Sequence, residues 1–73
     1  MVMSMNIVIV KGLPKKFNEQ LNWCKENFGL GKEVIGPTQA GLHRWSYELI
    51  GFGLRQLYFR DDSDYTLYLL RWS

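Results

Sequence analysis

Three sets of side chains could in principle do chemistry: one histidine, one cysteine and a short acidic run. His43 and Cys24 lie far apart in sequence, and neither has the partner that a general base or a metal ligand needs. Asp61, Asp62 and Asp64 are close together, but they match no calcium loop, since the turn glycine and the distal glutamate are missing. We therefore predict no catalytic residue, no metal site and no cofactor, and we expect that the protein is not an enzyme.

Basic and aromatic residues alternate in the second half of the chain. Trp45 and Tyr47 follow Arg44, and Tyr58 lies between two arginines. Proteins that bind single-stranded RNA or DNA use such mixtures on a sheet, because bases stack on the rings and cations neutralise the phosphates. The alternative is that these strand aromatics belong to the core. The candidate nucleic-acid-binding residues are Trp45, Tyr47, Arg55, Tyr58, Arg60, Lys15 and Lys16.

A second aromatic group lies in segments with helical spacing. Trp23 lies off the apolar stripe of its predicted helix, so it should reach a flank or a contact surface. The C-terminal segment is apolar on more than one side, which predicts burial against its own core and against something else. We therefore expect a homo-oligomer. The candidate interaction surface consists of Trp23, Tyr65, Tyr68 and Trp72.

Size and composition predict one small domain over residues 1–73, with 1–4 as a loose leader. The 73 residues carry a net charge of +2, which permits nucleic-acid binding without requiring it. Aromatic residues make up 15% of the chain, more than so small a core should hide, so some rings are expected at a surface. A single cysteine fits a reducing compartment, and the brief apolar start fits neither a signal peptide nor a membrane span. We expect a cytoplasmic protein with no membrane partner.

The elements that position these residues begin with a strand. Residues 5–10 form a β-branched apolar run, which is typical of a central strand covered on both faces. An apolar stripe then predicts a helix with Asn18 as its N-cap and Gly29 just after its end. The stripe consists of Phe17, Leu21, Cys24 and Phe28.

The second half of the chain predicts a hairpin and one ambiguous element. Residues 33–35 are expected to form a short strand within a turn-rich segment, and 44–50 and 54–60 should pair around Gly51-Phe52-Gly53. Residues 62–72 fit either a strand or a helix capped by Asp61 or Asp62. The predicted fold is α+β, a small ferredoxin-like sandwich in which an antiparallel sheet is backed by two helices.

The segment VIVKGLPKKFNEQLNWCKENFG, residues 8–29, resembles the opening of an RNA-recognition-motif domain. Gly51-Phe52-Gly53, Phe59 and the aspartates after it are similar to the third strand and second helix of that family. The resemblance implies a βαββαβ sheet that binds RNA on its face. Ile9 and Leu54 stand where the family has aromatic residues.

The C-terminal segment FRDDSDYTLYLLRW resembles small uncharacterised proteins of tailed phages of marine bacteria, which share a Phe-x-Asp-x-x-Asp…Leu-x-Trp pattern. The matching positions here are Phe59, Asp61, Asp64, Leu70 and Trp72. This resemblance implies a phage accessory protein in the host cytoplasm, with a host protein as a possible partner. It also favours a helix for the last element. The sequence thus predicts a non-catalytic binding module, for single-stranded nucleic acid or for protein partners.

Overall fold

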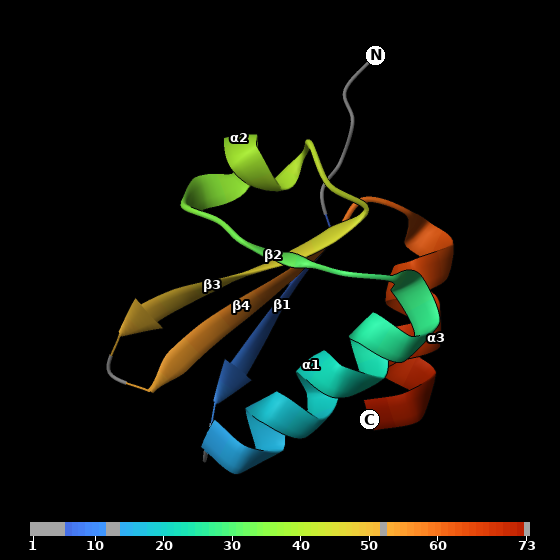
Figure 1. Ribbon diagram of the computed structural model, residues 1–73, viewed down its shortest axis with the longest axis horizontal. Coiled ribbons are helices and arrows are strands. Elements are labelled where there is room, and N and C mark those ends of the chain that lie inside the picture. Colours follow the sequence, from blue (N-terminus) through green and yellow to red (C-terminus); the bar gives the residue numbers. More distant parts are fainter. Residues whose placement is uncertain (1–5, 12–13, 52, 73) are drawn as a thin grey trace.

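The computed structural model describes residues 6–11, 14–51 and 53–72. In these residues strands and helices alternate until a hairpin and a last helix close the fold (Figure 1). The elements are β1 (Asn6–Lys11), α1 (Pro14–Phe28), β2 (Lys32–Glu33), α2 (Gly36–Ala40), β3 (Trp45–Gly51), β4 (Leu54–Phe59) and α3 (Asp62–Trp72). The predicted α+β class is confirmed, and the ambiguous last element is a helix.

The strands form one four-stranded sheet in the order β1-β4-β3-β2. β4 pairs antiparallel with both β1 and β3, whereas β2 pairs parallel with β3, so the sheet is mixed and not purely antiparallel. The parallel pair arises because the connection through α2 carries the chain back before β3 begins. The element order βαβαββα also differs from the βαββαβ order that the resemblance to RNA-recognition motifs implies.

The first strand lies at an edge of the sheet, and the predicted central position is wrong. Among the strands that the structure describes, β1 has a neighbour only on the β4 side. Its exposure alternates: Val8 and Val10 are half-buried under the helices, while Ile7 and Ile9 are exposed on the other face. The apolar run therefore means that both faces of β1 are apolar, and not that β1 lies between two of the described strands.

Helix α1 begins four residues before the predicted N-cap. Pro14 is its first residue, a position that suits proline because the missing N–H has no helical partner there. Asn18 therefore lies inside the helix and does not cap it. At the other end Gly29 has a φ of 88° and donates its N–H to the Lys25 carbonyl at 3.2 Å, as expected for a residue that ends a helix.

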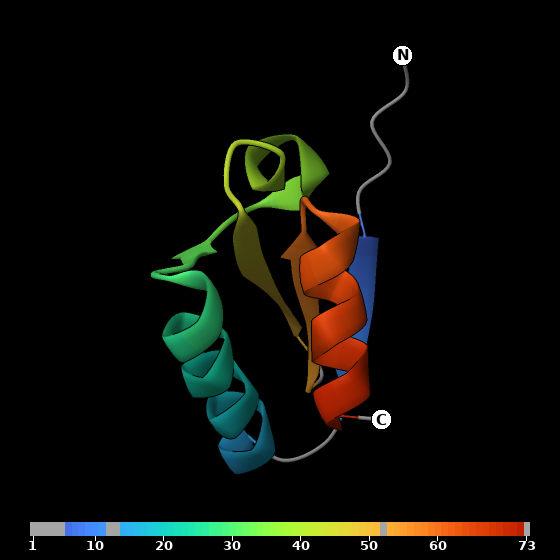
Figure 2. The ribbon, with the colours of Figure 1, turned by 90° about the vertical axis from the view of Figure 1, so that its right-hand side faces the viewer.

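Helices α1 and α3 lie side by side over one face of the sheet, and α2 packs against the opposite face (Figures 1 and 2). The core between helices and sheet is largely aromatic, with its rings in edge-to-face contacts such as Phe28 with Phe59. The opposite face has a small cluster of its own under α2, made of Val34, Ala40 and Tyr58. The buried main core consists of Phe17, Leu21, Cys24, Phe28, Trp45, Leu57, Phe59 and Tyr68.

Candidate interaction surface

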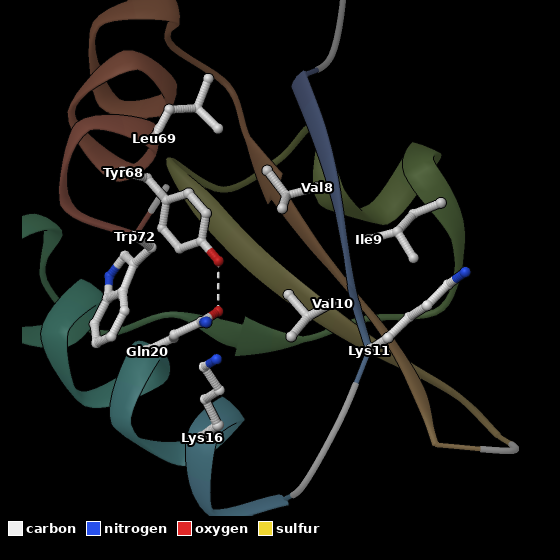
Figure 3. Close-up of a pocket in the computed structure, with 9 residues that line it drawn as sticks. All are labelled: Val8, Ile9, Val10, Lys11, Lys16, Gln20, Tyr68, Leu69 and Trp72. Carbon is white, nitrogen blue, oxygen red and sulfur yellow. Dashed lines mark hydrogen bonds between the residues drawn. The ribbon is translucent and has the colours of Figure 1, made fainter.

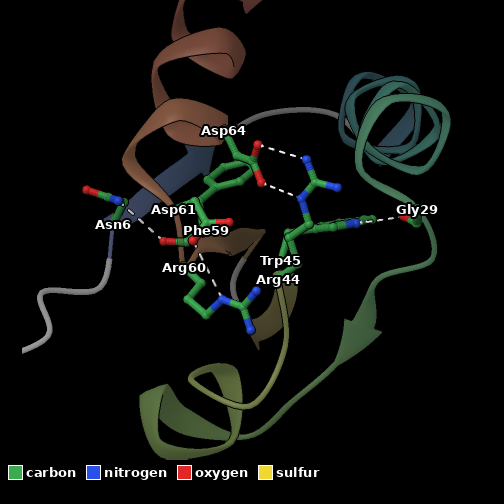
Figure 4. A network of polar contacts seen from close by, with 8 residues as sticks. All are labelled: Asn6, Gly29, Arg44, Trp45, Phe59, Arg60, Asp61 and Asp64. Atoms are coloured by element: carbon green, nitrogen blue, oxygen red, sulfur yellow. Dashed lines mark hydrogen bonds and ion pairs between the residues drawn. The ribbon is translucent and has the colours of Figure 1, made fainter.

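The two rings expected to form a stacking platform face the helices. Trp45 is 1% exposed, and its Nε1 donates to the Gly29 carbonyl at 2.8 Å (Figure 4). Tyr47 is half-buried on the same face, with its ring edge against Phe17 at 6.2 Å between centroids. Since α1 covers this part of the sheet, the structure leaves Trp45 no open surface on which a base could stack.

Tyr58 lies on the other face of the sheet, and it is also buried. The hydroxyl donates to Glu48 Oε1 at 2.6 Å and lies 2.8 Å from Gln56 Oε1. Burial, together with the hydrogen bond to Glu48 and its charge, raises the pKa of Tyr58 to about 12. The three candidate rings are thus divided between two faces and do not form one surface.

The four basic candidates lie at opposite ends of the molecule. Arg60 is exposed next to Asp61, with 3.7 Å between Nε and the carboxylate. Lys15 and Lys16 lie in the first turn of α1, where the Arg55 guanidinium covers the Phe17 ring at 5.3 Å. Lys15, Lys16 and Arg55 therefore belong to one basic end, and Arg60 does not.

The C-terminal aromatic residues join the two large helices. The rings of Trp23 and Trp72 meet edge to face at 6.3 Å, and Trp23 also contacts Tyr68. Tyr68 is buried and its hydroxyl donates to Gln20 Oε1, while Tyr65 packs against Phe59 at 6.4 Å. The four candidates are mostly helix-packing residues.

Two of these rings, those of Trp23 and Trp72, are half-buried and line a shallow groove between α1 and α3. The groove has a volume of about 340 Å³ and is lined by Glu19, Asn22, Trp23, Glu26, Arg71 and Trp72. Trp23 and Trp72 are therefore the two members of the predicted interaction surface that border it.

Some of the side chains that could carry chemistry take part in an ion pair or in the core. Arg44 Nε lies 2.7 Å from Asp64 Oδ2, and a second hydrogen bond makes the pair bidentate (Figure 4). This pair raises the pKa of the Arg44 guanidinium, first through the hydrogen bond and then through charge. Cys24 is fully buried, and burial, with a smaller effect of the Asp64 charge, raises its pKa to about 12. At neutral pH the buried Cys24 thiol is protonated and so is not an activated nucleophile.

Among the described residues, no group of three or more His, Cys, Asp or Glu side chains converges in a way that could hold a metal ion. Likewise, none of the helices that the structure describes is both long enough and apolar enough to cross a membrane.

The free edge of β1 is the feature that the sequence reasoning missed. The backbone N–H of Arg60 donates to the Arg44 carbonyl at 3.0 Å, so these two residues, next to the ends of β3 and β4, form a hydrogen-bonded pair. Bonded and non-bonded pairs alternate in antiparallel ladders, so Leu57, three residues before Arg60, is in a non-bonded pair with β3 and points its backbone groups toward β1. Its partner on β1, Val8, is therefore hydrogen-bonded to β4. The residues of β1 whose backbone groups point away from the sheet are therefore Ile7, Ile9 and Lys11.

A second groove runs beside this edge. Its volume is about 300 Å³, and Val8 and Val10 from β1 face Leu69 and Trp72 from α3 across it (Figure 3). Lys16, Gln20 and Tyr68 line its other parts, whereas Ile9 and Lys11 border it along the strand and point their side chains to the opposite face. The β1 edge, meaning strand Asn6–Lys11 with this groove, is thus apolar on both sides.

Comparisons of the chain with protein-family models, curated proteins and solved structures found no match. The resemblances to RNA-recognition motifs and to phage proteins therefore stay predictions.

Proposed function

We propose that the chain is a non-catalytic protein-interaction module that binds an extended protein segment along the β1 edge. The observation that carries the proposal is the position of an apolar β-branched strand at a free edge of the sheet. Such an edge offers a row of backbone donors and acceptors that another strand can pair with. The backbone supplies binding energy, and the side chains on either face select the partner.

Both faces of the β1 edge are suited to apolar side chains. On the open face Ile7 and Ile9 are 45% and 58% exposed. On the helix side Val8, Val10 and Leu69 border the groove. A strand added here places alternate side chains beside these two surfaces, so the preferred partner is a segment with apolar residues at successive positions.

Nucleic-acid binding is a second candidate function, favoured by the basic end of the same surface. Lys11 and Lys16 border the groove in which Trp72 is half-buried, and Lys15 and Arg55 lie nearby. Phosphates are attracted to such clusters, and the affinity falls steeply with salt. The burial of Trp45 and Tyr58 removes the stacking platform, which is why we place this candidate second.

A peptide titration tests the proposed function. The probe is a synthetic peptide with the β1 sequence NIVIVK and added terminal lysines for solubility; the control peptide has proline at its centre, which removes a ladder donor. Followed by two-dimensional NMR, the first peptide should shift the amides of Ile7, Ile9 and Lys11 and slow their exchange. The control peptide should have a much smaller effect.

A short single-stranded oligonucleotide is the competing probe. If it shifts the amides of Lys11, Lys15 and Lys16 in a salt-dependent manner while the peptide shifts none, nucleic-acid binding replaces protein binding as the function. If neither probe binds and the chain is monomeric under the same conditions, the β1 edge is no docking site and the proposal is overturned.

A further inference from the structure

The strand pattern of β1 conflicts with its place in the sheet. A run apolar on both faces is typical of internal strands, whereas edge strands usually carry protection against pairing. β1 has little such protection: Asn6–Lys11 contains no proline, its register with β4 is continuous, and its single charge, Lys11, is the last residue. The conflict disappears if another strand occupies the edge.

From this conflict we infer that the occupant is a second copy of the chain, joined β1 to β1 in antiparallel orientation about a two-fold axis. This inference rests on the proposed function, because it names the partner of the same edge. The chain itself supplies a strand with the required alternation, since Ile7 and Ile9 match the open face and Val8 and Val10 match the groove. A two-fold contact of this kind is closed: it pairs the β1 strands of the two copies with each other and does not propagate into a fibre.

The backbone directions select the register. Only residues whose N–H and C=O point outward can form hydrogen-bonded pairs, and these are Ile7, Ile9 and Lys11. With Ile9 opposite Ile9 of the second copy, Ile7 faces Lys11 and every outward residue is used. Val8 then lies opposite Val10 of the second copy on the helix side, at the closely spaced positions of the ladder.

The two-fold axis of this register is perpendicular to the sheet, which places the helices of both copies on the same face. Helix α3 flanks β1 on that face (Figure 2), so Leu69 and Trp72 come to lie near the seam. The second copy therefore covers apolar groups of the groove that a monomer leaves partly open.

Opposite charges at the axis test both the contact and its register. Ile9→Glu and Ile9→Lys change a side chain that is 58% exposed in the monomer, so each variant should fold. In the dimer each places like charges directly opposite each other and should weaken association on the order of tenfold or more. Mixed in equal amounts, the two variants should restore a dimer, because Glu then faces Lys.

The measurement is sedimentation equilibrium of the full chain, with circular dichroism to confirm folding. The wild type should be dimeric at tens of micromolar. Leu70→Glu is the matched control, because this side chain is 77% exposed on α3, and it should remain dimeric. If the Ile9→Glu variant proves unfolded, Ile9→Lys and the cysteine variants below still decide the question.

Cysteine variants read the register directly. Ile9→Cys should be joined to a second copy by a short bifunctional thiol-reactive cross-linker, since opposed residues of a bonded pair are about 5.5 Å apart at Cα while their Cβ atoms are too widely spaced for an easy disulfide. Ile7→Cys should not be joined in this way, because residue 7 faces Lys11 of the second copy. The buried Cys24 does not compete for the cross-linker.

A monomeric wild type, or an Ile9→Glu variant as dimeric as the wild type without restoration on mixing, would overturn the self-pairing. The NMR peptide experiment keeps the two ideas apart. A monomer whose β1 amides respond to the peptide retains the interaction function and loses only the second copy as partner.

Discussion

At the scale of single residues, three buried titratable side chains, Cys24, Tyr58 and Tyr68, are held in their neutral forms. Tyr68 and Cys24 lie in the main core, and Tyr58 lies in the small cluster under α2. Burial is the main cause of the raised pKa of each, because a low-dielectric surrounding disfavours the charged form. At neutral pH these side chains are therefore protonated, and they contribute packing and hydrogen bonds between elements.

This arrangement predicts that the fold loses stability in alkali. The thiol ordinarily ionises at 9.0 and the two phenols at 10.0, whereas in the fold all three keep their protons until about 12. The unfolded chain therefore releases protons first, so the stabilisation is complete below pH 9 and is lost as the pH rises toward 12. Urea unfolding midpoints measured across this window should fall continuously.

Tyr68→Phe provides the control for this pH dependence. At neutral pH it should cost about 1 kcal/mol, because Gln20 Oε1 loses its donor. Above pH 10 the free energy of unfolding of the variant should fall less steeply than that of the wild type, since one ionising group is gone. A wild-type midpoint that stays constant through the window would contradict the explanation.

At the scale of elements, periodicity predicted what each segment is, but not where it lies. The stripe Phe17–Phe28 and the alternation around Trp45 report local burial, and both helix and hairpin are confirmed. The run Asn6–Lys11 shows that both faces of the strand are apolar. Neither composition nor spacing shows whether the same chain or another chain covers these faces. α2 was missed because Gly36–Ala40 is too short to show a helical period.

The candidate binding residues show the same limit. Alternation placed Trp45 and Tyr47 on one face and Ser46 on the other, but it could not say which face the helices cover. The structure answers this through contacts distant in sequence, such as Trp45 with Gly29. No local pattern encodes a pairing of that kind.

In the connection between α1 and β2, Gly31 lies very close to the Trp45 ring. A Cβ on Gly31 would lie 2.4 Å from Cζ2 of Trp45, so Gly31→Ala must displace a buried ring. We expect a loss of about 1–3 kcal/mol in the free energy of unfolding. The near-ultraviolet circular dichroism should change as well, because the indole bond to Gly29 is disturbed.

Gly29→Ala is the matched control for this prediction. Its φ of 88° makes alanine unfavourable by about 1–2 kcal/mol, but a Cβ there meets nothing within 4 Å. The aromatic spectrum should therefore remain that of the wild type. Adding Trp45→Phe to Gly31→Ala should cost less than the sum of the single changes, whereas strict additivity would argue against the contact.

At the scale of the whole molecule, the surplus of apolar surface is aliphatic. The sequence predicts exposed rings, yet every aromatic ring in the described residues is buried or half-buried. Edge-to-face contacts let many of these rings fill the space between helices and sheet. In the described part of the chain, the exposed large hydrophobic side chains are Ile7, Ile9, Leu30, Ile35, Leu42, Leu49, Ile50, Leu67 and Leu70. Two of them, Ile7 and Ile9, belong to the β1 edge, where no second strand among the described residues pairs with the backbone.

A chain of 73 residues has little stability to spare, so pairing at β1 should be visible in its thermal unfolding. If two folded copies associate and unfolded chains do not, raising the protein concentration stabilises the fold by mass action. The melting temperature should then rise with concentration, by roughly 4–8 °C for each kcal/mol gained in a domain of this size. The melting temperature of Ile9→Glu should depend much less on concentration, because its association is weakened. Equal behaviour of the two proteins in scanning calorimetry at several concentrations would mean that β1 does not pair with a second copy.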